Sequence, residues 1–304
     1  MTWIDPLAGQ LNAFRRRHED YAAGYLVTVR NAKTRQTYTE GLTQWFAFCD
    51  LMGIDPLHAI RAHVELWLHD LEAKGRKPRT IANRFTPVRQ FYAYLVDEDL
   101  LAKNPTNRVA RPKIPRVSPT GYLSASQMFD LVNAAQAFGV YEHALICVLS
   151  FNGLRIGEAC GTNVGHFQMR NNYPILVVTR KGGDTHWVEV GRRTEGALRA
   201  AAGDRANGEP LILNRYGNRM DQKAAARILE RARPFIRNCP ARLHPHMLRH
   251  SWATEADRAG VARTQTIRDG GWKDSRMLDA VYSHAAEQAG LGAAHRLEAS
   301  VLSG

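Results

Sequence analysis

The sequence predicts a mainly α-helical protein of two domains, with one small β-hairpin in the second. Three observations support this fold class. The length of 304 residues exceeds that of one average domain. Apolar residues recur at helical spacing over most of the chain and alternate at strand spacing only around 172–190. Prolines interleaved with basic residues mark a linker at 105–119, which leaves residues 1–104 and 120–304 as the expected domains.

Four helices are expected in the first domain. Gly53 and Gly75 end the second and third of them, and Thr80 is a plausible N-cap for the fourth. Pro87 lies inside that fourth helix and removes a backbone hydrogen bond, so we expect a kink or a restart with Thr86 as the cap. The expected spans are 11–29, 34–52, 58–74 and 80–95. The expected buried positions are Tyr21, Tyr25, Tyr38, Leu42, Trp45, Phe46, Cys49, Val64, Trp67, Leu68, Leu71, Ile81, Phe85, Val88, Tyr92 and Leu95, together with Leu11, Phe14 and Val29.

The second domain is expected to open with a capping box at Ser124–Gln127, followed by a helix. A largely apolar stretch at 141–151 predicts a buried helix that Gly153 breaks. The β-branched run at 172–180, the turn residues 181–184 and the alternating segment 186–190 predict the hairpin. The remainder is expected to be mainly helical, with 231–242 as a basic connection.

The charge of the chain suits a polyanionic partner. Its formal net charge is +12 and its pI is about 9.8, with basic residues spread along the whole sequence. A basic proteome background is the alternative explanation, and for each single arginine a solvated face is the alternative to a DNA contact. The candidate DNA contacts are Arg79, Arg84 and Arg89 in the fourth helix, and Arg108, Arg111 and Lys113 at the linker.

The cysteines and the N-terminus indicate the cellular setting. Cys49, Cys147, Cys160 and Cys239 form no C-x-x-C pair, so reduced thiols are favoured over disulfides or a metal site. The first residues lack the blocks of a signal peptide, and no apolar run approaches the roughly 20 residues that span a bilayer. We therefore expect a soluble protein of the cytoplasm, associated with DNA.

Two arginines are candidates for binding a phosphate. Arg155 follows the glycine break, where its planar guanidinium could face a bound anion, although an ion pair with Glu158 is an equal alternative. Arg249 shares a helical face with His246, three residues earlier. A histidine beside an arginine is expected to stay neutral at pH 7 and to be able to take or give a proton.

Three further residues are ambiguous when taken singly. Lys181 lies at a hairpin tip, where exposed lysines are common, and Arg180 beside it is a rival. Trp272 would ordinarily be a core residue, with an indole N–H that donates but cannot shuttle protons. Tyr282 would ordinarily be buried, and its phenol needs nearby cations to become a nucleophile at pH 7.

Taken in order, these pieces resemble the tyrosine recombinase (phage integrase) family. The resemblance is carried by Gly153–Glu158, Lys181-Gly182, the string His244–Thr254, Gly270–Trp272 and Val281–His284. It implies catalytic roles for Arg155, Lys181, His246, Arg249, Trp272 and Tyr282, and supporting roles for Glu158 and His250. The family pattern has no residue that corresponds to His244. Tyr282 lies one residue further from Trp272 than is usual in the family, and Ser283 is the only nearby substitute nucleophile.

The resemblance also implies an architecture and a mechanism. The first domain looks like a four-helix, SAM-like core-binding domain, and the second like the family's catalytic domain. Such enzymes cut and rejoin double-stranded DNA core sites through a 3′-phosphotyrosine, as tetramers on synapsed DNA, without metal or cofactor. The residues before Leu11 cannot form an arm-binding domain, so we expect a simple two-domain recombinase. The Gly270-Gly271-Trp272 departure and the altered Trp272–Tyr282 spacing favour an integrase of a phage or another mobile element, with a directionality factor as a candidate partner. A tail after Tyr282 is expected to dock on a neighbouring protomer.

Other functions stay open at this stage. A Xer-like resolvase of chromosome or plasmid dimers fits the same motifs. A DNA-binding protein that kept the fold without the chemistry would also have the basic helices. A relaxing topoisomerase of type IB would use a tyrosine too, and strand exchange would distinguish the two reactions.

Overall fold

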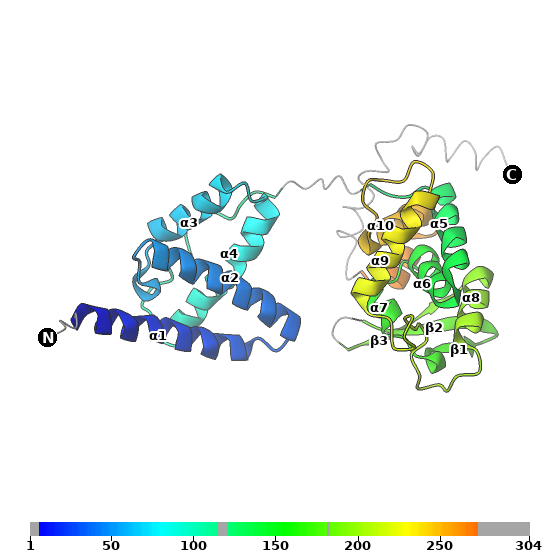
Figure 1. Ribbon diagram of the computed structural model, residues 1–304, viewed down its shortest axis with the longest axis horizontal. Coiled ribbons are helices and arrows are strands. Elements are labelled where there is room, and N and C mark those ends of the chain that lie inside the picture. Colours follow the sequence, from blue (N-terminus) through cyan, green and yellow to red (C-terminus); the bar gives the residue numbers. More distant parts are fainter. Residues whose placement is uncertain (1–5, 115–120, 181–182, 273–304) are drawn as a thin grey trace. The chain divides into compact units, whose positions relative to one another are not determined.

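The computed structural model describes residues 6–114, 121–180 and 183–272, with side chains from Arg17 onward. The chain divides into two compact units, residues 1–116 and 117–304 (Figure 1). In the first unit, α2 packs on α4, and both contact α1. Its helices are α1 (Pro6–Thr28), α2 (Ala32–Leu51), α3 (Arg61–Ala73) and α4 (Pro78–Asp97), with a short 3₁₀ turn at Pro56–His58.

The core of the first unit confirms the apolar stripes predicted from the sequence. Trp45, Trp67 and Tyr92 are each at most 1% exposed and lie edge to face around the centre. The indole N–H of Trp45 donates to the Tyr92 hydroxyl at 3.0 Å, and that hydroxyl donates to the carbonyl of Pro56 at 2.7 Å. The polar atoms of these two core rings are therefore satisfied without water. Of the residues expected in this core, Tyr38, Phe46, Tyr21 and Val29 are only partly buried.

Two predictions for α4 are wrong. The helix begins after Lys77, with Pro78 in its first turn, so Thr80 is not the N-cap. It also runs through Pro87 without restarting, and Thr86 is no cap, because its hydroxyl donates back to Ala82 O at 2.8 Å. The reason is a contact with α2: a Cβ built on Gly41 would lie 2.4 Å from Pro87 Cγ. The proline ring fills a close helix crossing, and this packing offsets the hydrogen bond that it removes.

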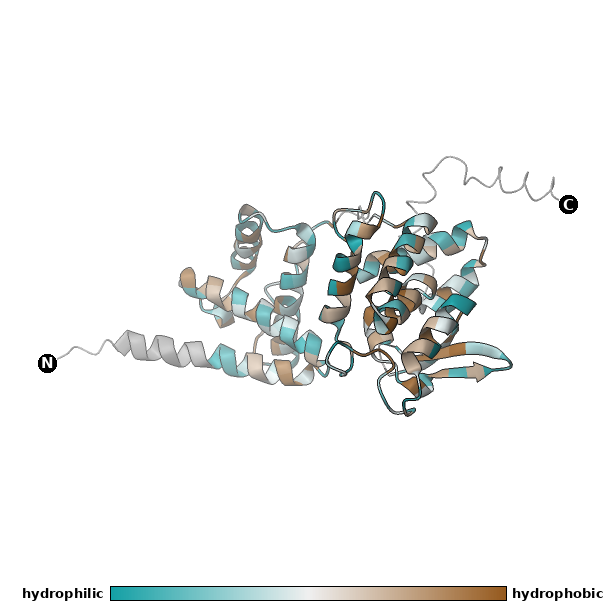
Figure 2. Cartoon of the chain, turned by 45° about the vertical axis from the view of Figure 1, so that its right-hand side comes forward, coloured by the Kyte–Doolittle hydropathy of each residue, from teal (hydrophilic) through white to brown (hydrophobic). Residues whose placement is uncertain are grey.

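The second unit consists of helices around α6, with a sheet along one side (Figure 1). The helix α6 packs against α5, α8 and α10, and its residues Ala144–Ser150 are all buried, as predicted. The apolar residues gather on the inward sides of these helices (Figure 2). The helices are α5 (Ala125–Phe138), α6 (Val140–Phe151), α7 (Ile156–Cys160), α8 (Arg192–Ala202), α9 (Gln222–Ala232), α10 (Pro245–Arg258) and α11 (Arg263–Gly270).

The predicted hairpin is part of a three-stranded antiparallel sheet of order β1-β2-β3. Its strands are β1 (Phe167–Arg170), β2 (Tyr173–Thr179) and β3 (Thr185–Glu189). Leu176 pairs with Val188 and both are buried on the core face. The four residues of β1 are partly or fully exposed, and only Phe167 packs against the core of the second unit.

The expected start of the second unit is confirmed in detail. Ser124 and Gln127 form the reciprocal capping box at the N-terminus of α5. Upstream of it, the Leu123 N–H donates to the Ser251 hydroxyl at 2.8 Å, and that hydroxyl donates to Met247 O at 2.9 Å. The segment that enters the second unit is thereby fixed to α10.

The four cysteines are free thiols, and three of them, Cys49, Cys147 and Cys160, are buried. Burial raises the pKa of Cys49 and Cys147 to about 12 and that of Cys160 to about 11, so all three stay protonated at neutral pH. Among the described residues, no helix is long and apolar enough to cross a membrane.

Candidate active site

The turn after α6 places Arg155 beside an acidic partner. Gly153 has φ +58, and Arg155 forms the N-cap of α7. The carboxylate of Glu158 is almost fully buried and accepts both the backbone N–H of Arg155 at 2.9 Å and its Nη1 at 2.6 Å. The Arg155 side chain is still 40% exposed. The ion pair considered from the sequence therefore exists, and it orients the guanidinium with one side open to solvent.

The helix α10 carries the second group of expected residues. His244, for which the sequence offered no role, is the N-cap: its Nδ1 accepts the Met247 N–H at 3.1 Å. His246 follows in the first turn, with its ring 4.5 Å from that of His250 in an edge-to-face arrangement. Burial of the His246 ring, then Arg249 and His244, lower its pKa. His246 is therefore neutral at pH 7, as predicted.

Arg249 is buried to 3% exposure and bound on two sides. Its Nη1 donates to Gly153 O at 2.6 Å, and its Nη2 donates to Gly270 O. The guanidinium carbon lies 4.2 Å from the centre of the Trp272 ring, within cation–π distance. Burial, followed by repulsion from Arg155, lowers the pKa of Arg249. Arginine nevertheless keeps its charge at neutral pH, so a fixed cation lies inside the protein.

The Gly270-Gly271-Trp272 sequence ends α11 and positions the tryptophan. The Trp272 N–H donates to Ile267 O and the Gly271 N–H to Arg268 O, both at 3.1 Å, which are the two bonds of a Schellman motif. Gly271 has the left-handed conformation that this motif requires, with φ +63. A Cβ on Gly270 would lie 2.1 Å from the Trp272 ring. The two glycines therefore let the indole fold back over the end of the helix.

Trp272 is a packing residue as well as a candidate donor. Its ring stacks on that of Trp252 of α10 at 5.9 Å between centroids, with 17° between the planes. Together with Ile267 these rings surround buried Ala253. The core role considered from the sequence does not separate Trp272 from the arginines, because its ring also contacts Arg249.

Arg180 is the residue whose position the sequence did not reveal. It follows the last residue of β2, and its Nη2 donates to Asp269 O at 2.8 Å, while both Nη atoms lie 3.2 Å from Arg268 O. The sequence suggested only a rival to Lys181. No local signal could have indicated the contact, since its acceptors are backbone carbonyls 88 and 89 residues further along the chain.

The structure thus brings together Arg155, Arg249, Trp272 and His246 from three segments of the second unit. Arg155 Nη2 donates to Gly271 O at 3.2 Å, and Arg249 donates to the neighbouring Gly270 O. Lys181 and Tyr282 lie outside the described residues. The arrangement gathers two guanidinium groups, an indole and a neutral imidazole in one region of the second unit.

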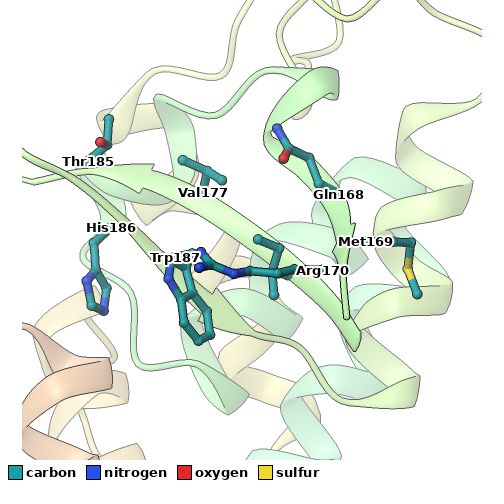
Figure 3. A pocket seen from close by; sticks show the side chains of 8 residues that line it. Gln168, Met169, Arg170, Val177, Thr185, His186 and Trp187 are labelled. Carbon is teal, nitrogen blue, oxygen red and sulfur yellow. The ribbon is translucent and has the colours of Figure 1, made fainter. Parts of the chain in front are cut away.

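A shallow pocket lies on the outer face of the sheet, and none of Arg155, Arg249 and Trp272 lines it. It is lined by side chains of all three strands, including Gln168, Thr185 and Trp187. Figure 3 shows Arg170 reaching across to Trp187, and its guanidinium carbon lies 4.9 Å from the centre of that ring. His186 lies at its edge, and burial followed by Arg180 lowers its pKa.

The candidate DNA contacts of the first unit lie at or near its surface. Arg79 is exposed in the first turn of α4, and Arg84 and Arg89 are partly buried further along that helix. Burial and repulsion from Arg76 lower the pKa of Arg84. Arg108, Arg111 and Lys113 are exposed after α4, in a segment whose Val109 is buried in the first core.

Both halves of the chain match known families. Residues 121–289 match the description "Phage integrase family", and residues 21–99 match "Phage integrase, N-terminal SAM-like domain". Among curated proteins, the tyrosine recombinase XerC of Mycobacterium sp. (strain KMS) is 29% identical over 252 residues, covering 76% of this chain and 81% of that one. The tyrosine recombinase XerD of Chlorobaculum tepidum is 25% identical, covering 86% and 89%.

Solved structures share the fold. A lambda integrase fragment (75-356), a dimer bound to a COC′ core site, superposes with a TM-score of 0.68 at 16% identity, covering 85% of this chain and 96% of that one. The site-specific recombinase XerH, in a post-cleavage complex with a palindromic difH substrate, gives a TM-score of 0.67 at 17% identity, with coverages of 88% and 78%.

Proposed function

The chain belongs to the phage integrase family, and we propose from this premise that Tyr282 is the nucleophile of a site-specific DNA recombinase. The observation that carries the proposal is the meeting of Arg155, Arg249 and Trp272 at the end of α11. Arg155 and Arg249 donate to the adjacent carbonyls of Gly271 and Gly270, and Arg249 lies against the Trp272 ring, so groups from distant parts of the sequence lie close together. In the proposal, a single phosphate would bind all three. A domain that only bound DNA would not need the buried Arg249 next to the exposed Arg155.

The substrate is the phosphodiester backbone of double-stranded DNA. Arg155 and Arg249 would bind the non-bridging oxygens of the scissile phosphate, and the indole N–H of Trp272 would donate a third hydrogen bond. These groups stabilise the charge that builds on the equatorial oxygens during the reaction, and such stabilisation usually contributes most of the rate enhancement. Arg249 donates to the carbonyls of Gly153 and Gly270, and the proposal assigns its remaining N–H donors to the phosphate.

Cleavage is a transfer of the phosphoryl group from the DNA to the enzyme. The Tyr282 oxygen attacks phosphorus, a 3′-phosphotyrosyl bond forms, and the bond to the 5′ oxygen breaks. Neutral His246 would take the phenol proton, directly or through water, and Lys181 would donate the proton that the leaving 5′ oxygen needs. The phosphate bond energy is kept in the ester. Attack by the 5′-hydroxyl of a partner strand therefore reseals the DNA without ATP.

The assembly and biological role belong to the same proposal. The enzyme would act as a homotetramer on two synapsed core sites, and integrate or excise a phage or other mobile element, with a directionality factor as a candidate partner. Residues 1–104 would grip the DNA, 105–119 would link the domains and 120–304 would carry the chemistry. Arg79, Arg84, Arg89, Arg108, Arg111 and Lys113 would contact the phosphates. A Xer-like resolvase uses the same chemistry on a different site.

The test is covalent capture. Wild type, Tyr282→Phe and the neighbouring control Ser283→Ala are incubated with a nicked or phosphorothiolate-containing core site and run on a denaturing gel. We expect a protein adduct on the 3′ end with wild type and with Ser283→Ala, and none with Tyr282→Phe. DNA that wild type binds but never captures would overturn the enzymatic function, and loss of the adduct only in Ser283→Ala would move the nucleophile to Ser283.

A further inference from the structure

The last four carbonyls of α11 and its cap are held by three arginines. Arg180 binds the carbonyls of Arg268 and Asp269, Arg249 binds that of Gly270, and Arg155 binds that of Gly271. The final carbonyls of a helix lack intrahelical partners and carry partial negative charge. Two of the arginines that offset this charge, Arg155 and Arg249, belong to the proposed phosphate site. The third, Arg180, follows strand β2.

Arg180 is fitted to this place. A Cβ built on Gly271 would lie 2.4 Å from Arg180 Cζ, so the guanidinium lies directly over the glycine. Its Nε is buried without a hydrogen-bond partner, and its Nη atoms point to the two carbonyls. The backbone of Arg180 is also fixed, since its N–H donates to Asp184 O at 2.8 Å and its carbonyl accepts the Gly183 N–H at 3.0 Å. The side chain therefore links the end of β2 to the end of α11 through its hydrogen bonds.

We infer that Arg180 is a positioning residue, which holds the end of α11 so that Trp272 and the Arg155–Arg249 pair are aligned for the phosphate. The inference rests on the proposed function. Arg180 binds the two carbonyls immediately before those that Arg249 and Arg155 bind, so a shift of the helix end would move the acceptors of both arginines together. It would also move Trp272, whose ring lies over Arg249.

Electrostatics gives Arg180 a second effect on the same site. The partial negative charge at the end of α11 would repel a bound phosphate and compete with it for the donors of Arg155 and Arg249. Arg180 compensates part of that charge without occupying the phosphate site itself. Glu158, Arg155 and Asp269 are the charged groups that act on it, which places it at the rim of the same cluster.

The rival role is a direct contact between Arg180 and DNA. It is disfavoured because Arg180 already uses three of its four Nη N–H groups on Arg268 O and Asp269 O, and because its Nε is buried. The two roles differ in what they predict for binding. A phosphate contact contributes to affinity and to the salt dependence of binding, whereas a positioning residue changes the cleavage rate at nearly constant affinity.

The experiment compares Arg180→Met, Arg180→Lys and the control Arg199→Met, an exposed arginine of α8 that pairs with Glu195. Single-turnover formation of the covalent adduct and DNA affinity are measured for each. We expect Arg180→Met to cleave about 100-fold more slowly, the effect typical of a misplacement of about 1 Å, with affinity unchanged within about twofold. Arg180→Lys keeps the charge and one donor nitrogen but not the planar fork, so it should recover part of the rate.

Two further measurements separate positioning from a loss of folding. The near-ultraviolet circular dichroism of the stacked Trp252–Trp272 pair should change in Arg180→Met while far-ultraviolet signal is retained. The losses of Arg180→Met and Trp272→Phe should be less than additive when combined, because both act through the same group. The inference would be overturned if Arg180→Met cleaved DNA at the wild-type rate, or if the rate losses of Arg180→Met and Trp272→Phe were additive. It would also be overturned if Arg180→Met bound DNA more weakly with a changed salt dependence. Absence of any adduct with wild type would instead overturn the proposed function.

Discussion

Gly153→Ala is expected to destabilise the second unit and to disturb the phosphate site together. Gly153 has φ +58, where an alanine costs about 1–2 kcal/mol in place of glycine. The new Cβ would also lie 2.2 Å from Trp252 Cε3 and 2.4 Å from its Cδ2. Trp252 cannot move aside freely because it stacks on Trp272, and such overpacking costs about 1–3 kcal/mol.

The expected loss is therefore about 3 kcal/mol, which for a domain of this size lowers Tm by about 6–12 °C. Differential scanning calorimetry measures it directly. The matched control is Gly217→Ala, in the same unit, because Gly217 has φ +77 and open space where the Cβ would be. It should show the backbone cost alone, about 1–2 kcal/mol.

Equal Tm shifts in Gly153→Ala and Gly217→Ala would refute this prediction, because they would mean that the contact with Trp252 adds no destabilisation. A second readout follows from the Gly153 carbonyl, which accepts Arg249 Nη1 at 2.6 Å. Adduct formation by Gly153→Ala at a temperature where it remains folded should be slower than that of Gly217→Ala.

Two further predictions concern stability. Tyr92→Phe leaves the Trp45 indole N–H buried without its partner, while the Pro56 carbonyl keeps the bond from the Ala59 N–H at 3.4 Å. The first unit should therefore lose about 1–3 kcal/mol of unfolding free energy, measured by urea denaturation; an unchanged midpoint would contradict this. Burial lowers the pKa of both His186 and His246, so the unfolded chain binds more protons than the folded one below about pH 6.5. Stability should be complete above that pH and fall as the pH is lowered toward the folded pKa values, and His186→Gln should flatten this dependence in thermal scans; an identical profile would count against the assignment.

The sequence predicted those parts of the fold that depend on neighbours along the chain. The stripes of α2, α3 and α4, the capping box at Ser124 and the buried helix α6 all follow from periodicity or from pairs three residues apart. The placement of His246 and Arg249 on one helix was of this kind as well. In each case the determining interaction spans one or two helical turns, which a pattern in the sequence records.

Features that depend on distant contacts could not be predicted in this way. Pro87 reads as a helix breaker until Gly41, far along the chain, is seen to accept its ring. Arg180 reads as an exposed turn residue until the end of α11 lies beside it. His244 is a local feature that was missed for a different reason: histidine is an uncommon N-cap, so its residue type did not indicate capping.

The burial of Arg249 bears on when each arginine loses its water. At 3% exposure, the Arg249 guanidinium has already lost nearly all of its hydration when the chain folds, and the carbonyls of Gly153 and Gly270 replace part of it. Its partner Arg155 keeps 40% exposure and must be dehydrated by the substrate itself. The two arginines would then act at different steps. Arg155 would bind a DNA phosphate as it arrives, and Arg249 would stabilise the charge that develops during the reaction from a position that needs no rearrangement.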